Sequence, residues 1–311
     1  MILGIDTSNY TTSVALYDSN NNTVRSFKKL LPVPQGEKGI RQSDAVFHHT
    51  MQIRELLDEA YKTEGRITAV GVSVKPCDND GSYMPCFMVG QTVAQSIAGA
   101  LDVPLYLFSH QRGHIAAALF SANRLDLLDS TFFAFHFSGG TSDALIVKPD
   151  YEKIISCELI AKSSDLKAGQ AVDRAGVMLG LPFPCGKYID ELARQSTAQY
   201  KITPSFSGLN PSFSGVENKC IKMINDDIDK KDIAKYVITY IMSSVDRMTS
   251  EILSKHGNLP VVYAGGVMCN SIIRERLSNK YDCYFAQPEF SSDNAAGVAV
   301  LASVKEKQNG R

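Results

Sequence analysis

The sequence predicts an α/β protein built as two lobes. Strand-like apolar runs gather at the start of each half of the chain, and helical patterns follow them. Two paired-glycine turns, Gly139-Gly140 and Gly265-Gly266, come directly after such runs. With 311 residues, of which 44% are hydrophobic, the chain is long enough to bury two cores.

The first half of the chain is expected to open on a β-hairpin. Residues 1–7 form an apolar run that ends near Asp6, and residues 12–17 alternate as the returning strand. The elements that follow are a helix at 44–61, a strand at 68–74, a helix at 87–101 and a strand at 104–108. A further helix should begin at the histidines His110 and His114.

The second half repeats the order of strands before helices. A β-meander is predicted at 131–160. The later elements are helices at 168–179, 188–194 and 232–255, a strand at 259–263, a helix at 268–277, a strand at 283–286 and a helix at 294–305. We therefore expect an N-terminal lobe at residues 1–103, completed by the C-terminal helix at 294–311, and a C-terminal lobe at 104–293.

The paired glycines indicate phosphate binding. Without a Cβ, the backbone can approach a ligand closely and direct N–H groups at phosphate oxygens. Neither turn matches GxGxxG or GxxxxGK[ST], which argues against a dinucleotide fold and a P-loop NTPase. An ordinary tight turn is the alternative for either one alone. Two such turns after separate strands suggest two lobes that grip one nucleotide in a cleft between them.

His110 and His114 form a candidate metal site. Their spacing places both imidazoles on one helix face, one turn apart, where they could share a metal ion. Asp293 is the candidate third ligand, although an acid opening a helix also serves as an N-cap. Two histidines and a carboxylate suit iron(II), zinc or manganese. Gln111 stands where HExxH peptidases have their general-base glutamate, so a zinc peptidase is not favoured.

Composition limits the setting in which the protein works. The formal net charge is −1, so no global basic field indicates nucleic-acid binding, and a local patch or a partner subunit would have to contact any nucleic acid. Seven cysteines without a CxxC pair are typical of free thiols in a reducing cytoplasm. No run of about 18 apolar residues predicts a membrane span. We expect a soluble cytoplasmic protein with no membrane association.

Eight motifs, in register from residue 1 to about residue 302, carry a resemblance to a known family. They are Asp6-Thr7-Ser8, His110-x3-His114, Ser138-Gly139-Gly140 and the segments 168–173, 179–186, 212–215, 264–270 and 292–294. In this order they resemble the tRNA threonylcarbamoyladenosine synthase transferases, formerly called O-sialoglycoprotein endopeptidases. Residues 211–215 match the Phe-Ser-Phe-Ser-Gly loop of this family, and we interpret a near-copy at 204–208 as an incidental duplication.

The resemblance implies two ribonuclease-H-like lobes of the actin, sugar-kinase and heat-shock ATPase type, with a nucleotide cleft between them. It implies one divalent metal ion on His110, His114 and Asp293, with iron(II) ahead of zinc or manganese. The nucleotide would be adenine-based, either threonylcarbamoyl-adenylate or ATP. The partners implied are tRNA, bound through partner subunits, and a homologous subunit and a small ATPase of a threonylcarbamoyl transfer complex.

The resemblance also assigns residues to the nucleotide. They are His136, Phe137, Ser138, Gly139, Gly140, Asp173, Gly186, Asp190, Gly265, Gly266 and Asn270. The aspartates would meet ribose hydroxyls, because a carboxylate accepts two hydrogen bonds from a diol, and Asn270 would reach the base or the ribose. A solvated helix face is the alternative for each aspartate. Asp6 is the catalytic candidate, to tune the attacking amine or hold a metal-bound water, and a structural turn role is its alternative.

The chain departs from the family pattern near the expected acceptor. Tyr10 and Thr11 stand where an Asp-Glu pair is usual, and Thr141 replaces a histidine. Leu166 and Gln170 replace acids, and the loop at 75–83 replaces a Gly-Pro-Gly loop. The motifs for nucleotide and metal are retained. The sequence therefore indicates a divergent paralogue with an altered acceptor, altered chemistry or reduced activity.

Three functions are consistent with this pattern. The first is transfer of a threonylcarbamoyl group from its adenylate to the exocyclic amine of an adenosine beside the tRNA anticodon, with release of AMP. The second is transfer of a carbamoyl-type group to another acceptor. The third is a non-catalytic nucleotide-binding partner of an active homologue, which would have no reason to keep His110, His114 and Asp293.

Overall fold

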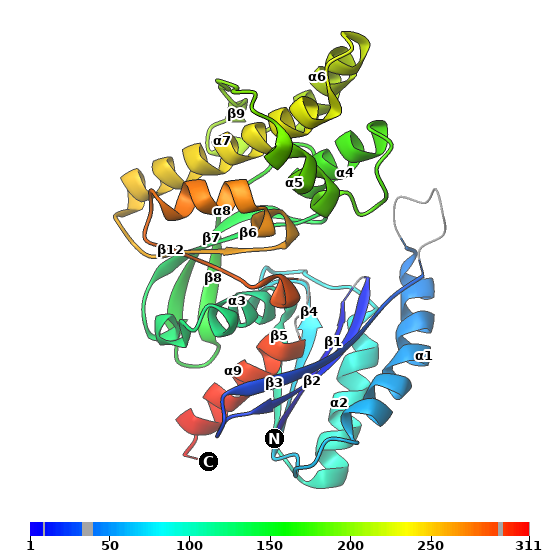
Figure 1. Ribbon diagram of the computed structural model, residues 1–311. Helices are drawn as coiled ribbons and strands as arrows, with labels where there is room; N and C mark the ends of the chain where they lie inside the picture. Colours follow the sequence, from blue (N-terminus) through cyan, green and yellow to red (C-terminus); the bar gives the residue numbers. More distant parts are fainter. Residues whose placement is uncertain (9, 33–39, 292–294, 311) are drawn as a thin grey trace. The chain divides into compact units, whose positions relative to one another are not determined.

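The computed structural model describes residues 1–8, 10–32, 40–291 and 295–310 and divides into two compact units (Figure 1). Unit 1 contains Met1–Leu128, Pro149–Ser156 and Ser292–Arg311, and unit 2 contains Asp129–Lys148 and Cys157–Ser291. A five-stranded mixed sheet with helices packed on it forms the centre of each unit. The predicted α/β fold with two lobes is confirmed.

Unit 1 is built on a sheet with the strand order β3-β2-β1-β4-β5. Its elements are β1 (Ile2–Ser8), β2 (Thr11–Asp18), β3 (Thr23–Leu30), α1 (Gln42–Ala60), β4 (Ala69–Lys75), α2 (Phe87–Leu101), β5 (Leu105–Ser109), α3 (His110–Ser121), the 3-10 helix η1 (Leu125–Asp129) and α9 (Ala295–Gln308). β1 pairs antiparallel with β2 and parallel with β4, and β4 pairs parallel with β5. Helices α1 and α2 cover one face of the sheet, and α9 lies on the other beside α3 (Figure 1).

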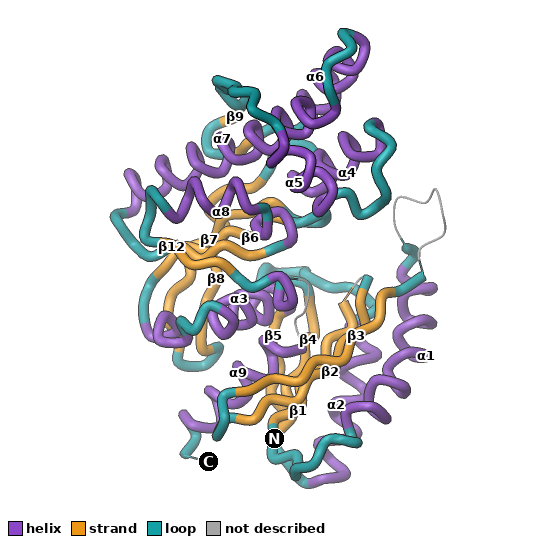
Figure 2. Tube along the Cα trace, viewed as in Figure 1, coloured by secondary structure: helices purple, strands orange, loops and turns teal. Residues whose placement is uncertain are grey.

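Unit 2 repeats this topology with the order β8-β7-β6-β11-β12. Its strands are β6 (Phe132–Phe137), β7 (Ser142–Asp150), β8 (Ile154–Lys162), β9 (Phe206–Ser207), β10 (Asn210–Pro211), β11 (Val261–Ala264) and β12 (Cys283–Phe285). Its helices are α4 (Ala168–Met178), α5 (Gly186–Gln195), α6 (Ser214–Asn225), α7 (Lys230–His256), η2 (Gly266–Cys269), α8 (Ser271–Ser278) and η3 (Pro288–Phe290). Figure 2 shows that the chain between β8 and β11 is mainly helical.

The boundary between the units differs from the one expected at residue 103. Residues 104–128 lie in unit 1, because β5 completes the first sheet by pairing with β4 and α3 packs on α9. The tip of the β7–β8 hairpin, Pro149–Ser156, also belongs to unit 1. This boundary does not follow from the sequence, because pairing between strands that are distant in the chain leaves no local pattern.

Three of the longer elements also differ from the prediction, apart from the short η1, β9, β10 and η3. β3 is an additional edge strand, and its exposed charged residues hid it from a search for apolar alternation. Helix α6 is likewise additional. The helix expected at 268–277 is divided into η2 and α8, because Asn270 ends the first and caps the second with its side chain.

Helix α9 packs unusually close to the rest of unit 1. A Cβ added at Gly4 of β1 would lie 2.0 Å from the Ala295 carbonyl oxygen, and one at Gly71 of β4 would lie 2.5 Å from that of Val298. A Cβ at Gly297 would lie 1.8 Å from the carbonyl oxygen of Gly113 in α3. Residues 295–303 of α9 are all buried, as expected for a helix that is apolar on every side.

We expect Gly297→Ala to destabilise the protein by about 2 kcal/mol or more, because α9 and α3 would have to separate. Gly99→Ala in α2 is the matched control, since its added Cβ meets no described atom within 4 Å and alanine is the better helix former. Urea unfolding of both variants measures the difference. Equal stability of Gly297→Ala and Gly99→Ala would show that the α3–α9 contact has room for an added methyl group.

A buried polar chain joins α1 to β2. The Gln52 side-chain amide donates to the Leu30 carbonyl, and its Oε1 accepts a hydrogen bond from the Thr12 hydroxyl at 2.8 Å. The Thr12 hydroxyl proton is thereby used, so the hydroxyl accepts from Nδ1 of His49, also at 2.8 Å. His49 Nε2 is buried and has no partner among the described residues. Burial lowers the pKa of His49 from 6.5 to about 4.

The low pKa of His49 predicts a loss of stability in acid. Between pH 6.5 and about 4 the unfolded chain binds a proton that the folded chain excludes, so the free energy of unfolding falls by about 2 kcal/mol from pH 7 to pH 5. His49→Gln should remove this part of the pH dependence, whereas His256→Gln at an exposed position should retain it. Urea unfolding at pH 7 and pH 5 measures this change in the free energy of unfolding for each variant. A change in His49→Gln as large as in the wild type would contradict the assignment of the pH dependence to His49.

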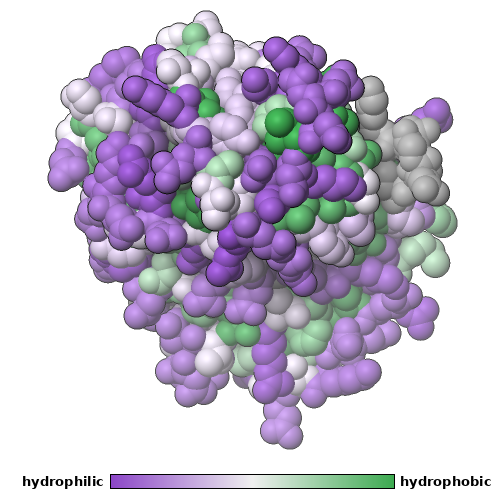
Figure 3. Space-filling model, turned by 45° about the horizontal axis from the view of Figure 1, so that its top comes forward, coloured by the Kyte–Doolittle hydropathy of each residue, from purple (hydrophilic) through white to green (hydrophobic). Residues whose placement is uncertain are grey.

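Hydrophilic side chains predominate on the face shown in Figure 3, and apolar residues appear there in small patches. None of the described helices has the length and apolar character required to cross a membrane.

Candidate functional site

The two predicted histidines lie together at the start of α3. Ser109, the last residue of β5, accepts the backbone N–H of Arg112 with its side chain and so caps the helix. His110 is the first helical residue, and His114 follows one turn later. Their ring centroids are 4.5 Å apart, and the ring planes are inclined by 69°. The strand-to-helix junction therefore presents two imidazoles as a pair.

Asp6 holds the first of these histidines. It lies near the end of β1, is 2% exposed, and its Oδ1 is 3.1 Å from His110 Nδ1. Its Oδ2 accepts a hydrogen bond from the Ser8 hydroxyl at 2.6 Å. Burial raises the pKa of Asp6, but the electrostatic interaction with His110 and the hydrogen bonds to the carboxylate outweigh this effect, so the pKa is lowered overall. Both carboxylate oxygens of the catalytic candidate are thus engaged within unit 1.

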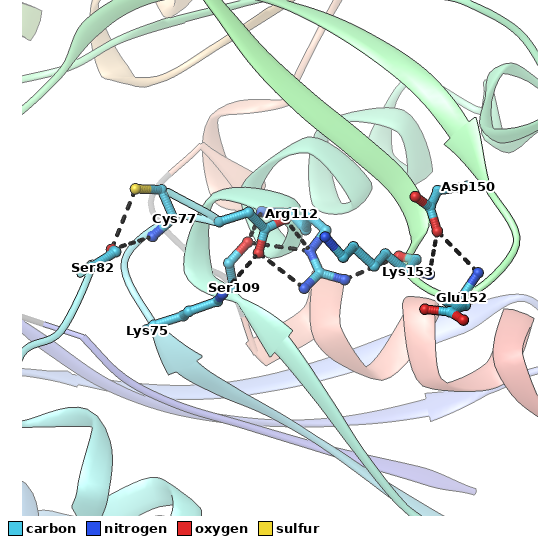
Figure 4. Close-up of polar contacts among 9 residues, drawn as sticks. Lys75, Cys77, Ser82, Ser109, Arg112, Asp150, Glu152 and Lys153 are labelled. Carbon is cyan, nitrogen blue, oxygen red and sulfur yellow. Dashed lines mark hydrogen bonds and ion pairs between the residues drawn. The ribbon is translucent and has the colours of Figure 1, made fainter. Parts of the chain in front are cut away.

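Arg112, between the two histidines, ties α3 to two loops (Figure 4). Its Nη2 donates to Asp78 Oδ1 at 3.1 Å, its Nε lies 2.9 Å from Asp78 Oδ2, and its Nη1 donates to the Lys153 carbonyl. Lys75 Nζ lies 3.6 Å from the same aspartate. The loop at 75–83, which departs from the family pattern, is thereby fixed to the histidine helix. The Arg112–Asp78 ion pair could not be predicted from the sequence, because 34 residues separate the two side chains.

The structure describes only two of the three predicted metal ligands. Asp293, the predicted third ligand, lies outside the described residues. Within the described ranges, no group of three or more His, Cys, Asp or Glu side chains is arranged to hold a metal ion. His110 and His114 nevertheless fit a divalent metal ion such as iron(II), zinc or manganese, because they are adjacent imidazoles and a buried carboxylate orients one of them.

The first glycine turn closes tightly after β6. Ser138 donates its N–H to the Thr141 carbonyl, and its hydroxyl accepts from the N–H groups of Gly140 and Thr141 at 3.3 and 3.1 Å. Cβ atoms added at Gly139 and Gly140 would meet no described atom within 4 Å. The backbone here is open to a ligand. His136 and Phe137 are the last two residues of the strand, half-buried and buried respectively.

The second glycine turn packs directly on the first. β11 pairs parallel with β6, so Ala264 lies opposite His136. Gly265 has a φ of +93°, and a Cβ there would lie 2.3 Å from the Phe137 carbonyl oxygen. A Cβ at Gly266 would meet no described atom within 4 Å. Both turns thus belong to unit 2, and both fall within the C-terminal lobe predicted at 104–293.

The first turn of α4 supports the Ser138 turn, a contact that the sequence analysis missed. The Gly169 N–H donates to the Ser138 carbonyl at 3.1 Å. A Cβ at Gly169 would lie 2.5 Å from the Gly139 nitrogen, so only glycine allows this approach. The signal in the sequence was a glycine at the second position of a predicted helix.

The other predicted nucleotide residues are also in unit 2. Asp190 of α5 accepts from Asn270 Nδ2 at 2.9 Å and from the Ser271 hydroxyl at 3.0 Å. Asn270 Oδ1 caps α8 by accepting two backbone N–H groups. Asp173 Oδ1 accepts the Cys185 N–H at 2.8 Å, and burial raises the pKa of this carboxyl. A Cβ at Gly186 would meet no described atom within 4 Å.

Asp165 organises the loop Pro211-Ser212-Phe213-Ser214-Gly215. It accepts hydrogen bonds from the Ser212 hydroxyl and from the N–H groups of Phe213 and Ser214. Burial opposes its ionisation, but these hydrogen bonds prevail and lower its pKa to about 2. Within the near-copy of the motif at 204–208, β9 pairs antiparallel with β10 at the start of the second copy.

These features define a class of protein. Two α/β units with the same strand order, one bearing a histidine pair and the other two adjoining glycine turns, form a fold of the actin and sugar-kinase type. The model of the TsaD family, tRNA N6-adenosine threonylcarbamoyltransferase, matches residues 33–300, and the chain belongs to this family.

Solved structures support the fold. Full-length HypF in its phosphate- and nucleotide-bound form matches at 13% identity with a TM-score of 0.56, over 98% of this chain but 55% of its own. The 2-hydroxyisocaproyl-CoA dehydratase activator from Clostridium difficile, with bound ADPNP, matches at 15% identity and a TM-score of 0.57, over 100% and 97% of the two chains. A ROK family protein from Streptococcus pneumoniae in complex with sucrose matches at 12% identity and a TM-score of 0.57, over 99% of each.

The glycine turns provide a test of nucleotide binding. Gly140→Val and Gly266→Val place branched side chains in open space above the turns, so we expect AMP affinity to fall about tenfold or more while the melting temperature changes little. Gly265→Ala is the contrasting variant, because its φ and the nearby Phe137 carbonyl should destabilise the fold itself. Calorimetry with AMP and thermal unfolding separate the two effects. Unchanged AMP affinity in both valine variants would exclude these turns from the nucleotide site.

Proposed function

We propose that this protein transfers the threonylcarbamoyl group of threonylcarbamoyl-adenylate to the exocyclic amine of an anticodon-adjacent adenosine in tRNA. The observation that carries the proposal is the family match over residues 33–300, supported by the histidine pair that a buried aspartate orients. The adenosine nitrogen would form a bond to the carbamoyl carbon, and the bond from that carbon to the phosphate oxygen would break. AMP leaves, and the amine loses one proton to the solvent.

Each group of site residues has a part in this proposal. His110 and His114, with Asp293, would hold a divalent metal, iron(II) or alternatively zinc or manganese, which would act as a Lewis acid toward the adenylate. The turns at Ser138-Gly139-Gly140 and Gly265-Gly266 would bind its phosphate, helped by His136 and Phe137. Asp173, Gly186, Asp190 and Asn270 would line the ribose and the base. Phosphate oxygens would then compete with the Ser138 hydroxyl for the turn N–H groups.

The acceptor would require further subunits. With a formal net charge of −1, the chain offers tRNA phosphates no overall attraction. We therefore propose that tRNA binds together with partner subunits, among them a homologous subunit and a small ATPase.

A second candidate function is transfer of a carbamoyl-type group to a different acceptor. Tyr10, which stands where an acid is usual, is 40% exposed, and Thr11 beside it is half-buried. The loop at 75–83 is held in its own arrangement by the Arg112–Asp78 pair. These differences lie at the surface and in a loop, where a new acceptor could be accommodated.

Direct assay distinguishes the two functions. Wild-type protein, His114→Ala and the double variant Tyr10→Asp with Thr11→Glu are each incubated with the homologous subunit, the small ATPase, unmodified tRNA and threonylcarbamoyl-adenylate, and the modified nucleoside is measured by mass spectrometry. If the acceptor has changed, the wild type should modify tRNA poorly, and the restored acids should raise the rate about a hundredfold, the usual size of a general-base effect.

His114→Ala serves as the control for site chemistry, since product that survives this change does not come from the proposed site. Efficient modification of tRNA by the wild type, without the restored acids, would reject the altered-acceptor function and support the tRNA reaction. No product from either the wild type or the double variant would count against the tRNA reaction.

A further inference from the structure

Asp6 is placed to act through His110 rather than on a substrate. It is almost fully buried in β1, and both of its oxygens have partners, His110 Nδ1 for Oδ1 and the Ser8 hydroxyl for Oδ2. A group with this little exposure cannot move to meet a reacting amine without breaking both contacts. Asp6 and His110 are 104 residues apart in the sequence, and both belong to unit 1.

The direction of these hydrogen bonds follows from the chemistry of the groups. An ionised carboxylate only accepts, so the hydroxyl of Ser8 donates to Oδ2, and the ring of His110 must donate to Oδ1 from Nδ1. In a neutral imidazole with its proton on Nδ1, the second nitrogen carries a lone pair. That lone pair is what a metal ligand needs.

Neighbouring groups restrain the same ring on other sides. Phe87, the first residue of α2, contacts it edge-on with centroids 5.9 Å apart, and His114 lies 4.5 Å away. Ser109 fixes the first helical turn, on which His110 stands. Rotation of the ring would lose the Asp6 hydrogen bond and disturb both aromatic contacts. Orientation and tautomer are therefore set together.

We propose that Asp6 is a positioning residue that fixes His110 as its Nδ1–H tautomer and thereby presents Nε2 to a divalent cation. The inference rests on the proposed function, because that function assigns the cation to His110 and His114. It replaces the direct catalytic role expected for Asp6. Carboxylates that orient ligating histidines typically contribute about 10- to 100-fold in metal affinity.

The first measurement needs no metal. Nitrogen-15 histidine spectra of metal-free protein report which ring nitrogen carries the proton, and the spectrum of His110→Gln assigns the signal. We expect wild-type His110 to be protonated on Nδ1 with a lone pair on Nε2. A neutral His110 with its proton on Nε2 would overturn the proposal, whatever the activity of the protein.

The second measurement is titration calorimetry with Zn²⁺ and Mn²⁺ as probes. Asp6→Asn keeps the side-chain size but removes the obligate acceptor, and we expect it to bind Zn²⁺ about 10- to 100-fold more weakly than wild type. Ser8→Ala is the matched control, since it removes the hydrogen bond to Oδ2 and leaves Oδ1 with His110, and we expect it to stay within about twofold of wild type. Wild-type affinity in folded Asp6→Asn would overturn the proposal.

The outcomes separate this proposal from the proposed function. If His110 has the Nδ1 proton but neither ion binds to wild type, the metal in the proposed function is rejected, and with it the purpose assigned to Asp6. If the ions bind and His114→Ala abolishes binding, while Asp6→Asn has no effect, the metal site remains and the positioning role fails. Circular dichroism of each variant shows that the measured protein is folded.

Discussion

The contact of α9 with α3 and the first sheet is the constraint on which the rest of unit 1 depends. Carbonyl oxygens of α9 approach Gly4 and Gly71 so closely that any side chain there would collide with the helix. Gly297 and Gly113 meet in the same way where α9 crosses α3. Because interiors are close-packed, a shift of α9 would be transmitted to α3. Gly113 stands directly before His114, so this contact also fixes the histidine pair.

The two units share a topology but carry their candidate site groups at different points of it, after β5 in unit 1 and after β6 and β11 in unit 2. The first strand of each sheet, β1 or β6, ends in a polar turn, and a parallel neighbour lies beside it. In unit 1 the functional groups are side chains, an imidazole pair and the carboxylate that orients it. In unit 2 they are backbone groups at glycine turns. Side chains with lone pairs suit a cation, whereas N–H groups suit phosphate, so the duplicated fold offers two complementary kinds of site.

The sequence predicted what short-range spacing determines. The histidine pair follows from a four-residue spacing on a helix, and the two glycine turns follow from buried strands directly before them. The Asp6–His110 and Asp78–Arg112 contacts could not be predicted, since folding joins residues that are far apart in the chain. The same limit explains the misplaced lobe boundary, which depends on β5 pairing with β4 rather than on any local pattern.

Asp6 differs in burial from the neighbouring altered residues Tyr10 and Thr11. Replacing the buried Asp6 would leave its hydrogen-bond partners unsatisfied, and a side chain at Gly297 would force α9 and α3 apart. Tyr10 and Thr11 lie at the hairpin turn between β1 and β2, the first exposed and the second half-buried. Substitution at an exposed position typically changes stability by about 0.5 kcal/mol or less. The acceptor side of such a site can therefore diverge while the histidine pair and the glycine turns stay intact, because the groups that hold them are internal to each unit.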